Sequence, residues 1–160
     1  MVLSALTLVH VAISLIGIAA GFVAAAGLLS STISRGWTIL FLATTILTSL
    51  TGFLFPVVSL LPSHVVGILS LALLAVASFA LYGKHLSGYW RTIYVVTALI
   101  SLYLNVFVLV IQAFLKVPAL KALAPTQTEP AFVAVQAVTL AVFVLVTILA
   151  AIKFRAPAVA

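Results

Sequence analysis

Long apolar runs separated by short polar stretches dominate the chain, and they lie at about residues 2–29, 38–55, 63–82, 92–115 and 131–152. A hydrocarbon core of about 30 Å needs roughly 20 apolar residues per helix, and only helices or closed barrels satisfy every backbone group there. Unbroken apolar runs favour helices, because barrel strands alternate polar and apolar residues. The pattern therefore predicts an all-α integral membrane protein, with a bundle of five transmembrane helices over residues 1–155 and a short tail at 156–160.

The breaks between the runs are predicted to be turns and one longer loop. Pro56 and Pro62 bracket a very short apolar turn, which indicates a tight hairpin between the second and third helices. Residues 117–130 contain three prolines and the only acidic residue, Glu129, so they cannot form one continuous helix and must lie at the membrane interface. Within this loop, residues 118–125 could float in the interface as a short lid over the outer end of the bundle.

The basic residues divide unequally between the two ends of the predicted bundle. When successive helices alternate in direction, five basic residues fall at one end and two at the other. Since loops rich in Lys and Arg stay in the cytoplasm, we expect the first end to be cytoplasmic, with the N-terminus outside and the C-terminus inside. The first set is Arg35, Lys84, Arg91, Lys153 and Arg155, and the second is Lys116 and Lys121.

Composition narrows the chemistry further. Hydrophobic side chains make up 66% of the 160 residues and charged ones 5%, which leaves too little polar surface to coat a water-soluble domain. The net charge of +6 comes from seven basic residues spread along the chain, so no nucleic-acid patch is predicted. The absence of cysteine excludes disulfides, thiolate-bound iron–sulfur clusters and covalently attached haem. No catalytic motif is found, so we do not expect a stand-alone enzyme.

Polar side chains at helical spacing mark the helix faces that look away from lipid. The run at 92–115 carries the longest such stripe, which predicts a helix at the centre of the bundle. With a rise of about 1.5 Å per residue, the predicted topology gathers polar residues from several helices in the outer half of the bundle, above Asn105 near the middle of the membrane. The resulting candidate site consists of His10, His64, Asn105, Gln112, Lys116 and Gln136.

Two histidines beside amide side chains inside a membrane predict a pocket for a small ligand or cofactor. One form of this hypothesis is a b-type haem, with His10 and His64 as axial ligands of the iron and Lys116 or Lys121 paired with the propionates. Another is a quinone-like head group whose carbonyl oxygens accept hydrogen bonds from His64, Gln112 and Asn105. A metal site without haem is not expected, because no Cys and no buried carboxylate complete a ligand set.

Two other interpretations stay open. The polar stripe of the fourth helix could line a path for a solute or ion, although cation and proton pathways usually need buried carboxylates. The polar residues could instead only hold the helices together, as a subunit of a larger membrane complex would require. Gly17 and Gly21 form a G-x-x-x-G pattern that predicts close helix packing, and together with Gly52 they could also serve self-association.

Two segments give the sequence a resemblance to other proteins. Residues Pro62 to Gly67 read P-S-H-V-V-G, and Leu104 to Pro118 read L-N-V-F-V-L-V-I-Q-A-F-L-K-V-P. Both resemble segments of small polytopic bacterial inner-membrane proteins that are usually described only as uncharacterised. The resemblance implies a location in a bacterial inner membrane and brings no activity with it.

Overall fold

The computed structural model describes residues 2–55 and 62–155, and all regular elements in these ranges are helical. The protein is therefore all-α, as the sequence predicts. The predicted turn after Pro56 and the predicted tail at 156–160 lie outside the described residues. The elements are α1 (Val2–Leu29), α2 (Arg35–Gly52), α3 (Pro62–Ser78) with a π-helical turn η1 (Phe79–Gly83), α4 (Tyr89–Lys116), the short α5 (Pro118–Leu123) and α6 (Pro130–Lys153).

Four of the described helices are long and apolar enough to cross a membrane, which corrects the predicted number of spans from five to four. They are α1, α3 continued through η1, α4 and α6. The exception is α2, which has 18 residues and is interrupted throughout by hydroxyl side chains. Hydroxyl groups lower the apolar character on which independent membrane insertion depends. Those residues of α2 are Thr38, Thr44, Thr45, Thr48, Ser49 and Thr51.

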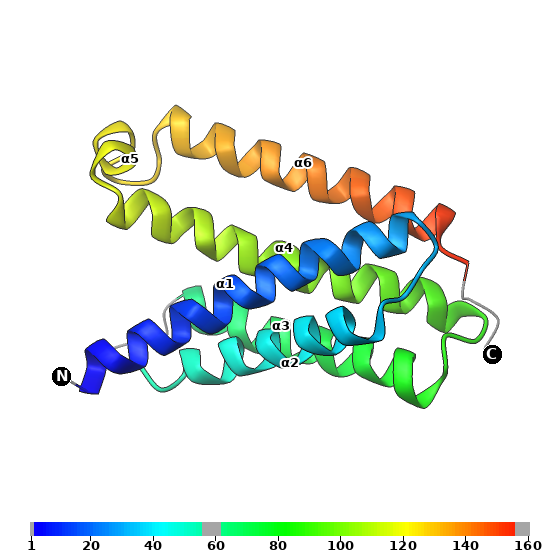
Figure 1. Ribbon diagram of the computed structural model, residues 1–160. Coiled ribbons are helices and arrows are strands. Elements are labelled where there is room, and N and C mark those ends of the chain that lie inside the picture. The colour runs from blue at the N-terminus through cyan, green and yellow to red at the C-terminus, as the bar shows by residue number, and fades with distance from the viewer. Residues whose placement is uncertain (1, 56–61, 156–160) are drawn as a thin grey trace.

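The long helices run alternately up and down the bundle (Figure 1). Helix α2 returns beside α1, with which it makes the most extensive helix contact, and α3 then starts near the end of the bundle where α1 starts. Helix α4 contacts α1, α2, α3 and α6, which confirms the prediction that it lies at the centre. Helix α6 lies on the outside, against α4 and the second half of α1.

Small residues let the helices approach closely, as is common where membrane helices meet. On α1, a Cβ atom at Gly17 would lie 2.9 Å from Thr44 Oγ1, and one at Gly21 would lie 2.9 Å from the ring of Phe41. These contacts confirm the close packing that the G-x-x-x-G pattern predicts. Buried alanines play the same part elsewhere in the core, at positions 20, 77, 80, 98 and 150.

Helix α6 packs through one side, on which Phe143 near its middle and Ala150 near its end are buried. Most of its large side chains are exposed; Val138 is 63% exposed and Ile152 71%. On so apolar a helix, exposed side chains of this kind are suited to contact with lipid. At its C-terminal end, Phe154 is fully buried. The hydroxyl of Ser31 donates to the carbonyl oxygen of Arg155 at 2.8 Å and accepts from the Arg155 N–H at 2.7 Å. This pair of hydrogen bonds ties the end of α6 to the turn between α1 and α2.

The loops at the two ends of the bundle are held by different chemistry. Between α3 and α4, the ammonium of Lys84 lies 5.5 Å from the ring centre of Phe79 and 5.7 Å from that of Trp90, which are cation–π distances. Between α5 and α6, Glu129 accepts hydrogen bonds from Thr126 and from the N–H of Thr128. Desolvation raises the pKa of the Glu129 carboxyl, but these hydrogen bonds outweigh it and lower the pKa below its usual value. Their contribution to the stability of the loop is therefore lost only as the pH falls through that lowered pKa.

Candidate functional site

A cavity of about 90 Å³ lies among α1, α2, α3 and α4. Since a water molecule takes up about 30 Å³ in the liquid, the cavity has room for about three waters, or for one small ring. Three of the six predicted site residues meet here, one each from α1, α3 and α4. The lining consists of His10, Thr48, Ser49, Gly52, Phe53, His64, Val66, Gly67, Ser70, Asn105 and Val108.

His64 enters the cavity wall from the first turn of α3. Its side chain is only 9% exposed, and its ring lies 5.6 Å from that of Phe53 at the end of α2. Gly67, one turn further along α3, leaves room for the same phenyl ring, because a Cβ there would lie 3.2 Å from Phe53 Cζ. Neither ring nitrogen of His64 has a hydrogen-bond partner among the residues that the structure describes. The imidazole is thus packed against the Phe53 ring, and the described part of the chain makes no hydrogen bond to it.

Two further polar groups at the cavity are unpaired. Thr48 of α2 is 8% exposed, and its hydroxyl has no partner in residues 2–55 or 62–155. The Asn105 side-chain amide nitrogen on α4 is likewise buried without a partner in the described chain. By contrast, the hydroxyl of Ser49 donates to the carbonyl oxygen of Thr45 at 3.0 Å. The cavity therefore presents unused donors from three helices, at His64, Thr48 and Asn105.

His10 approaches the cavity from α1 in a defined hydrogen-bonding state. Its Nδ1 lies 2.8 Å from Thr51 Oγ1, near the end of α2, and its ring packs edge-on against Phe55 at 5.2 Å. Gly52, the last residue of α2, leaves space for this ring, since a Cβ there would lie 3.8 Å from His10 Cε1. The two histidines that the sequence singles out thus border one cavity, on opposite sides of the end of α2.

The other three predicted site residues do not line this cavity. The Gln136 amide on α6 donates to the carbonyl oxygen of Phe107 on α4 at 3.2 Å, so this part of its side chain serves helix packing. Gln112 lies on α4 beyond the cavity, and Lys116 is exposed in the last turn of the same helix. The topology brings them to the expected end of the bundle, but their side chains are not part of the cavity wall.

Sequence reasoning missed three hydroxyl residues of the site: Ser49, Thr51 and Ser70. A signal for Ser49 is present, because Thr48 and Ser49 follow Thr45 at helical spacing and share one side of α2. That hydroxyl side faces the neighbouring helices, as the burial of Thr45, Thr48 and Ser49 shows. Thr51 comes two residues after Ser49 and does not face the same way. Ser70 lies two turns after His64 in an otherwise apolar stretch of α3, and nothing in the local sequence distinguishes it.

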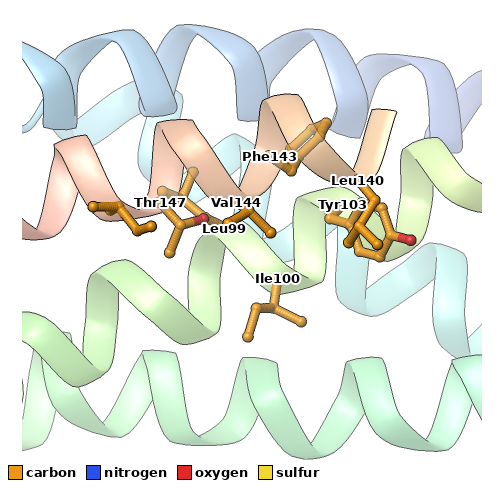
Figure 2. A pocket seen from close by; sticks show the side chains of 8 residues that line it. Leu99, Ile100, Tyr103, Leu140, Phe143, Val144 and Thr147 are labelled. Atoms are coloured by element: carbon orange, nitrogen blue, oxygen red, sulfur yellow. The ribbon is translucent and has the colours of Figure 1, made fainter. Parts of the chain in front are cut away.

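A second, larger cavity of about 190 Å³ lies between α4 and α6 and contains none of the predicted residues (Figure 2). Its walls are aliphatic and aromatic except for the hydroxyls of Tyr103 and Thr147. Such a surface offers dispersion contacts and few hydrogen bonds. We therefore assign the candidate site to the smaller cavity, where the unpaired polar groups lie.

No protein-family model, no curated protein and no solved structure matches this chain. The resemblance of its two segments to small bacterial inner-membrane proteins stays a prediction. What the structure supports is the class: a small polytopic protein with four long apolar helices suited to a lipid bilayer.

Proposed function

We propose that this chain is a small integral membrane binding protein whose cavity holds the polar head group of a small, membrane-soluble molecule. The observation that carries the proposal is the convergence of unpaired polar groups of Thr48, His64 and Asn105 on one cavity. Leaving a buried donor or acceptor unsatisfied costs about 1–3 kcal/mol, so such a group calls for a partner outside the chain, such as a water, an ion or a ligand. A ligand supplies that partner.

The donors on the cavity wall favour a ligand that carries an acceptor oxygen. Asn105 offers N–H groups, Thr48 a hydroxyl hydrogen and His64 one ring N–H. Carboxylates do not line the cavity, and the described residues contain no group of three His, Cys, Asp or Glu side chains that could hold a metal ion. A carbonyl, ether or hydroxyl oxygen on a single small ring matches both the chemistry and the size, in keeping with the quinone-like hypothesis.

Haem does not fit this site. Pockets for drug-sized ligands measure about 300–1,000 Å³, well above the 90 Å³ between α1 and α4. The two histidines are therefore better suited to hydrogen bonding than to axial ligation.

Binding is also better supported than a solute path along α4. Two hydroxyls of the polar stripe of α4 bond to the backbone of their own helix and do not offer hydrogen bonds to a solute. The hydroxyl of Thr97 donates to the carbonyl oxygen of Ile93 at 2.7 Å, and that of Ser101 donates to the carbonyl oxygen of Thr97 at 2.8 Å. Both residues are buried in the core against neighbouring helices. Asn105 is the member of the stripe whose amide faces the cavity without a partner.

Binding is tested by titrating the purified protein, in a mild detergent, with 4-fluorophenol and with 4-fluoroanisole and following the ¹⁹F resonance. Both probes carry one ring and one acceptor oxygen. Asn105→Leu removes the donor at nearly constant volume and should weaken the binding of both probes roughly tenfold, as expected for a lost buried hydrogen bond. Each titration is compared with the same micelles without protein, so that partitioning into detergent is subtracted.

Gln112→Met is the matched control, because it removes an amide from the same helix outside the cavity. It should leave both affinities unchanged. If neither probe binds the unaltered protein above the micelle background, or if Asn105→Leu and Gln112→Met behave alike, the cavity is not the binding site proposed here.

We further propose that α6 ends in the cytoplasm and that α1 begins outside. Helices α1 and α6 start at the same end of the bundle, and α4 ends there with Lys116 (Figure 1). Lys84 and Arg91 lie at the opposite end, with Lys153 at the close of α6. The excess of positive charge at that second end supports its cytoplasmic placement.

A green fluorescent protein fused after residue 160 tests this orientation, because its chromophore matures when the fusion stays in the cytoplasm. We expect fluorescent cells, together with no activity of an alkaline phosphatase fused at the same position, since that enzyme requires export. The reverse pattern would show that the C-terminus lies outside.

A further inference from the structure

The hydrogen bond between His10 and Thr51 indicates which ring nitrogen of His10 carries the hydrogen. Thr51 has one hydroxyl hydrogen, and its Oγ1 lies 2.7 Å from the carbonyl oxygen of Leu47 and 3.2 Å from that of Thr48. Both carbonyl oxygens can only accept, so the hydroxyl hydrogen is committed to the α2 backbone. Towards His10 Nδ1, at 2.8 Å, Thr51 Oγ1 can then only accept. This arrangement favours the tautomer with its hydrogen on Nδ1.

A neutral imidazole with its hydrogen on Nδ1 has a bare lone pair on Nε2. An uncompensated charge is costly inside a bilayer, and no carboxylate lines the cavity to offset one, which keeps the ring neutral. Among the described residues the structure gives Nε2 no hydrogen-bond partner, whereas His10 itself borders the cavity. The α1 side of the site thus offers an acceptor, while the α4 side offers the donor of Asn105.

We propose that the ligand carries a hydroxyl or N–H group as well as an acceptor oxygen, and that the site prefers it over the counterpart without that hydrogen. This inference rests on the proposed function and names its ligand class: a phenol- or quinol-like head group rather than a fully ketonic or fully etherified one. The hydroxyl hydrogen goes to His10 Nε2, and the ligand oxygen accepts from Asn105. Thr51 is a positioning residue, since it acts on the ligand only through the tautomer of His10.

The two fluorinated probes separate this inference from simple binding. 4-Fluorophenol and 4-fluoroanisole both accept a hydrogen bond, but only the phenol donates one. After subtraction of partitioning, we expect the phenol to bind roughly five- to tenfold more tightly, the size expected for one additional hydrogen bond. Thr51→Val keeps the shape of the side chain and removes its oxygen, so the preference should fall towards equality. Thr51→Ser keeps the oxygen and should keep the preference.

The tautomer is read directly by ¹⁵N NMR of histidine-labelled protein, with the His10 signals assigned by their loss in His10→Gln. We expect a bare Nε2 and a protonated Nδ1 in the unaltered protein and in Thr51→Ser, and a mixture of tautomers in Thr51→Val. A protonated Nε2 in the unaltered protein would overturn the inference. Equal affinities for the two probes, or an unchanged preference in Thr51→Val, would also overturn it while leaving the proposed binding function in place. Binding of neither probe would remove the proposed function itself.

Discussion

Replacing Gly21 with alanine should lower the thermal stability of the bundle markedly. Gly21 lies where α1 meets both α2 and α4, and a Cβ atom there would overlap Leu102 Cδ1 and lie 2.9 Å from Phe41 Cδ2. Leu102 and Phe41 are 1% and 2% exposed, so neither side chain can move aside into open space. Overpacking of this kind costs about 1–3 kcal/mol. The midpoint temperature, measured by size-exclusion chromatography after heating, should fall by about 2–4 °C for each kcal/mol lost.

Gly36→Ala provides the matched control for Gly21→Ala. Gly36 lies in the first turn of α2, and a Cβ atom there would meet nothing within 4 Å. Alanine also favours helix over glycine, by up to about 1 kcal/mol, so this variant should be neutral or slightly more stable. Equal midpoint temperatures for the two variants would contradict the close packing assigned to Gly21.

Replacing Phe154 with alanine should release the C-terminal end of α6. Its side chain is fully buried just beyond the helix, and truncating a buried phenylalanine costs about 3–5 kcal/mol. The chain contains no cysteine, so a single cysteine placed at the buried position of Ala150 can report on this end. Its reaction with a maleimide should be slow in the otherwise unaltered protein and fast in the Phe154→Ala background.

Ile152→Ala removes a comparable side chain from the same turn, but Ile152 is 71% exposed. The cysteine at position 150 should stay protected in this variant, and the midpoint temperature should change little. If Ile152→Ala exposed the cysteine as much as Phe154→Ala, the end of α6 would not depend on the burial of Phe154.

The sequence predicts the helices well, because backbone groups inside a bilayer must form hydrogen bonds within the protein and long apolar runs do so as helices. It predicts the number of independent spans less well. The hydroxyl residues of α2 interrupt its apolar run, and their side chains pack inside the bundle, as the burial of Thr45 and Thr48 shows. Mean hydropathy along the sequence cannot tell a hydroxyl that faces lipid from one that faces a neighbouring helix.

The candidate site is predicted only in part, for a related reason. Depth along a helix can be counted from the sequence, which predicts His10, His64 and Asn105 near one another, and all three border the cavity. How far a cavity extends along a helix cannot be counted in this way, because it depends on the side chains of the neighbouring helices. Gln112 is seven residues after Asn105, which suggests the same face, but it lies two turns nearer the end of α4 and beyond the cavity.

The open groove between α4 and α6 makes the bilayer itself a part of the fold. A volume of about 190 Å³ between these helices is bounded by Leu99, Tyr103, Phe143 and other largely apolar side chains. In a membrane, the hydrocarbon tails of neighbouring lipids can fill such an apolar groove. We therefore expect the seating of α6 to respond to the acyl chains around it, whereas α6 contributes no residue to the lining of the cavity where the ligand is proposed to bind.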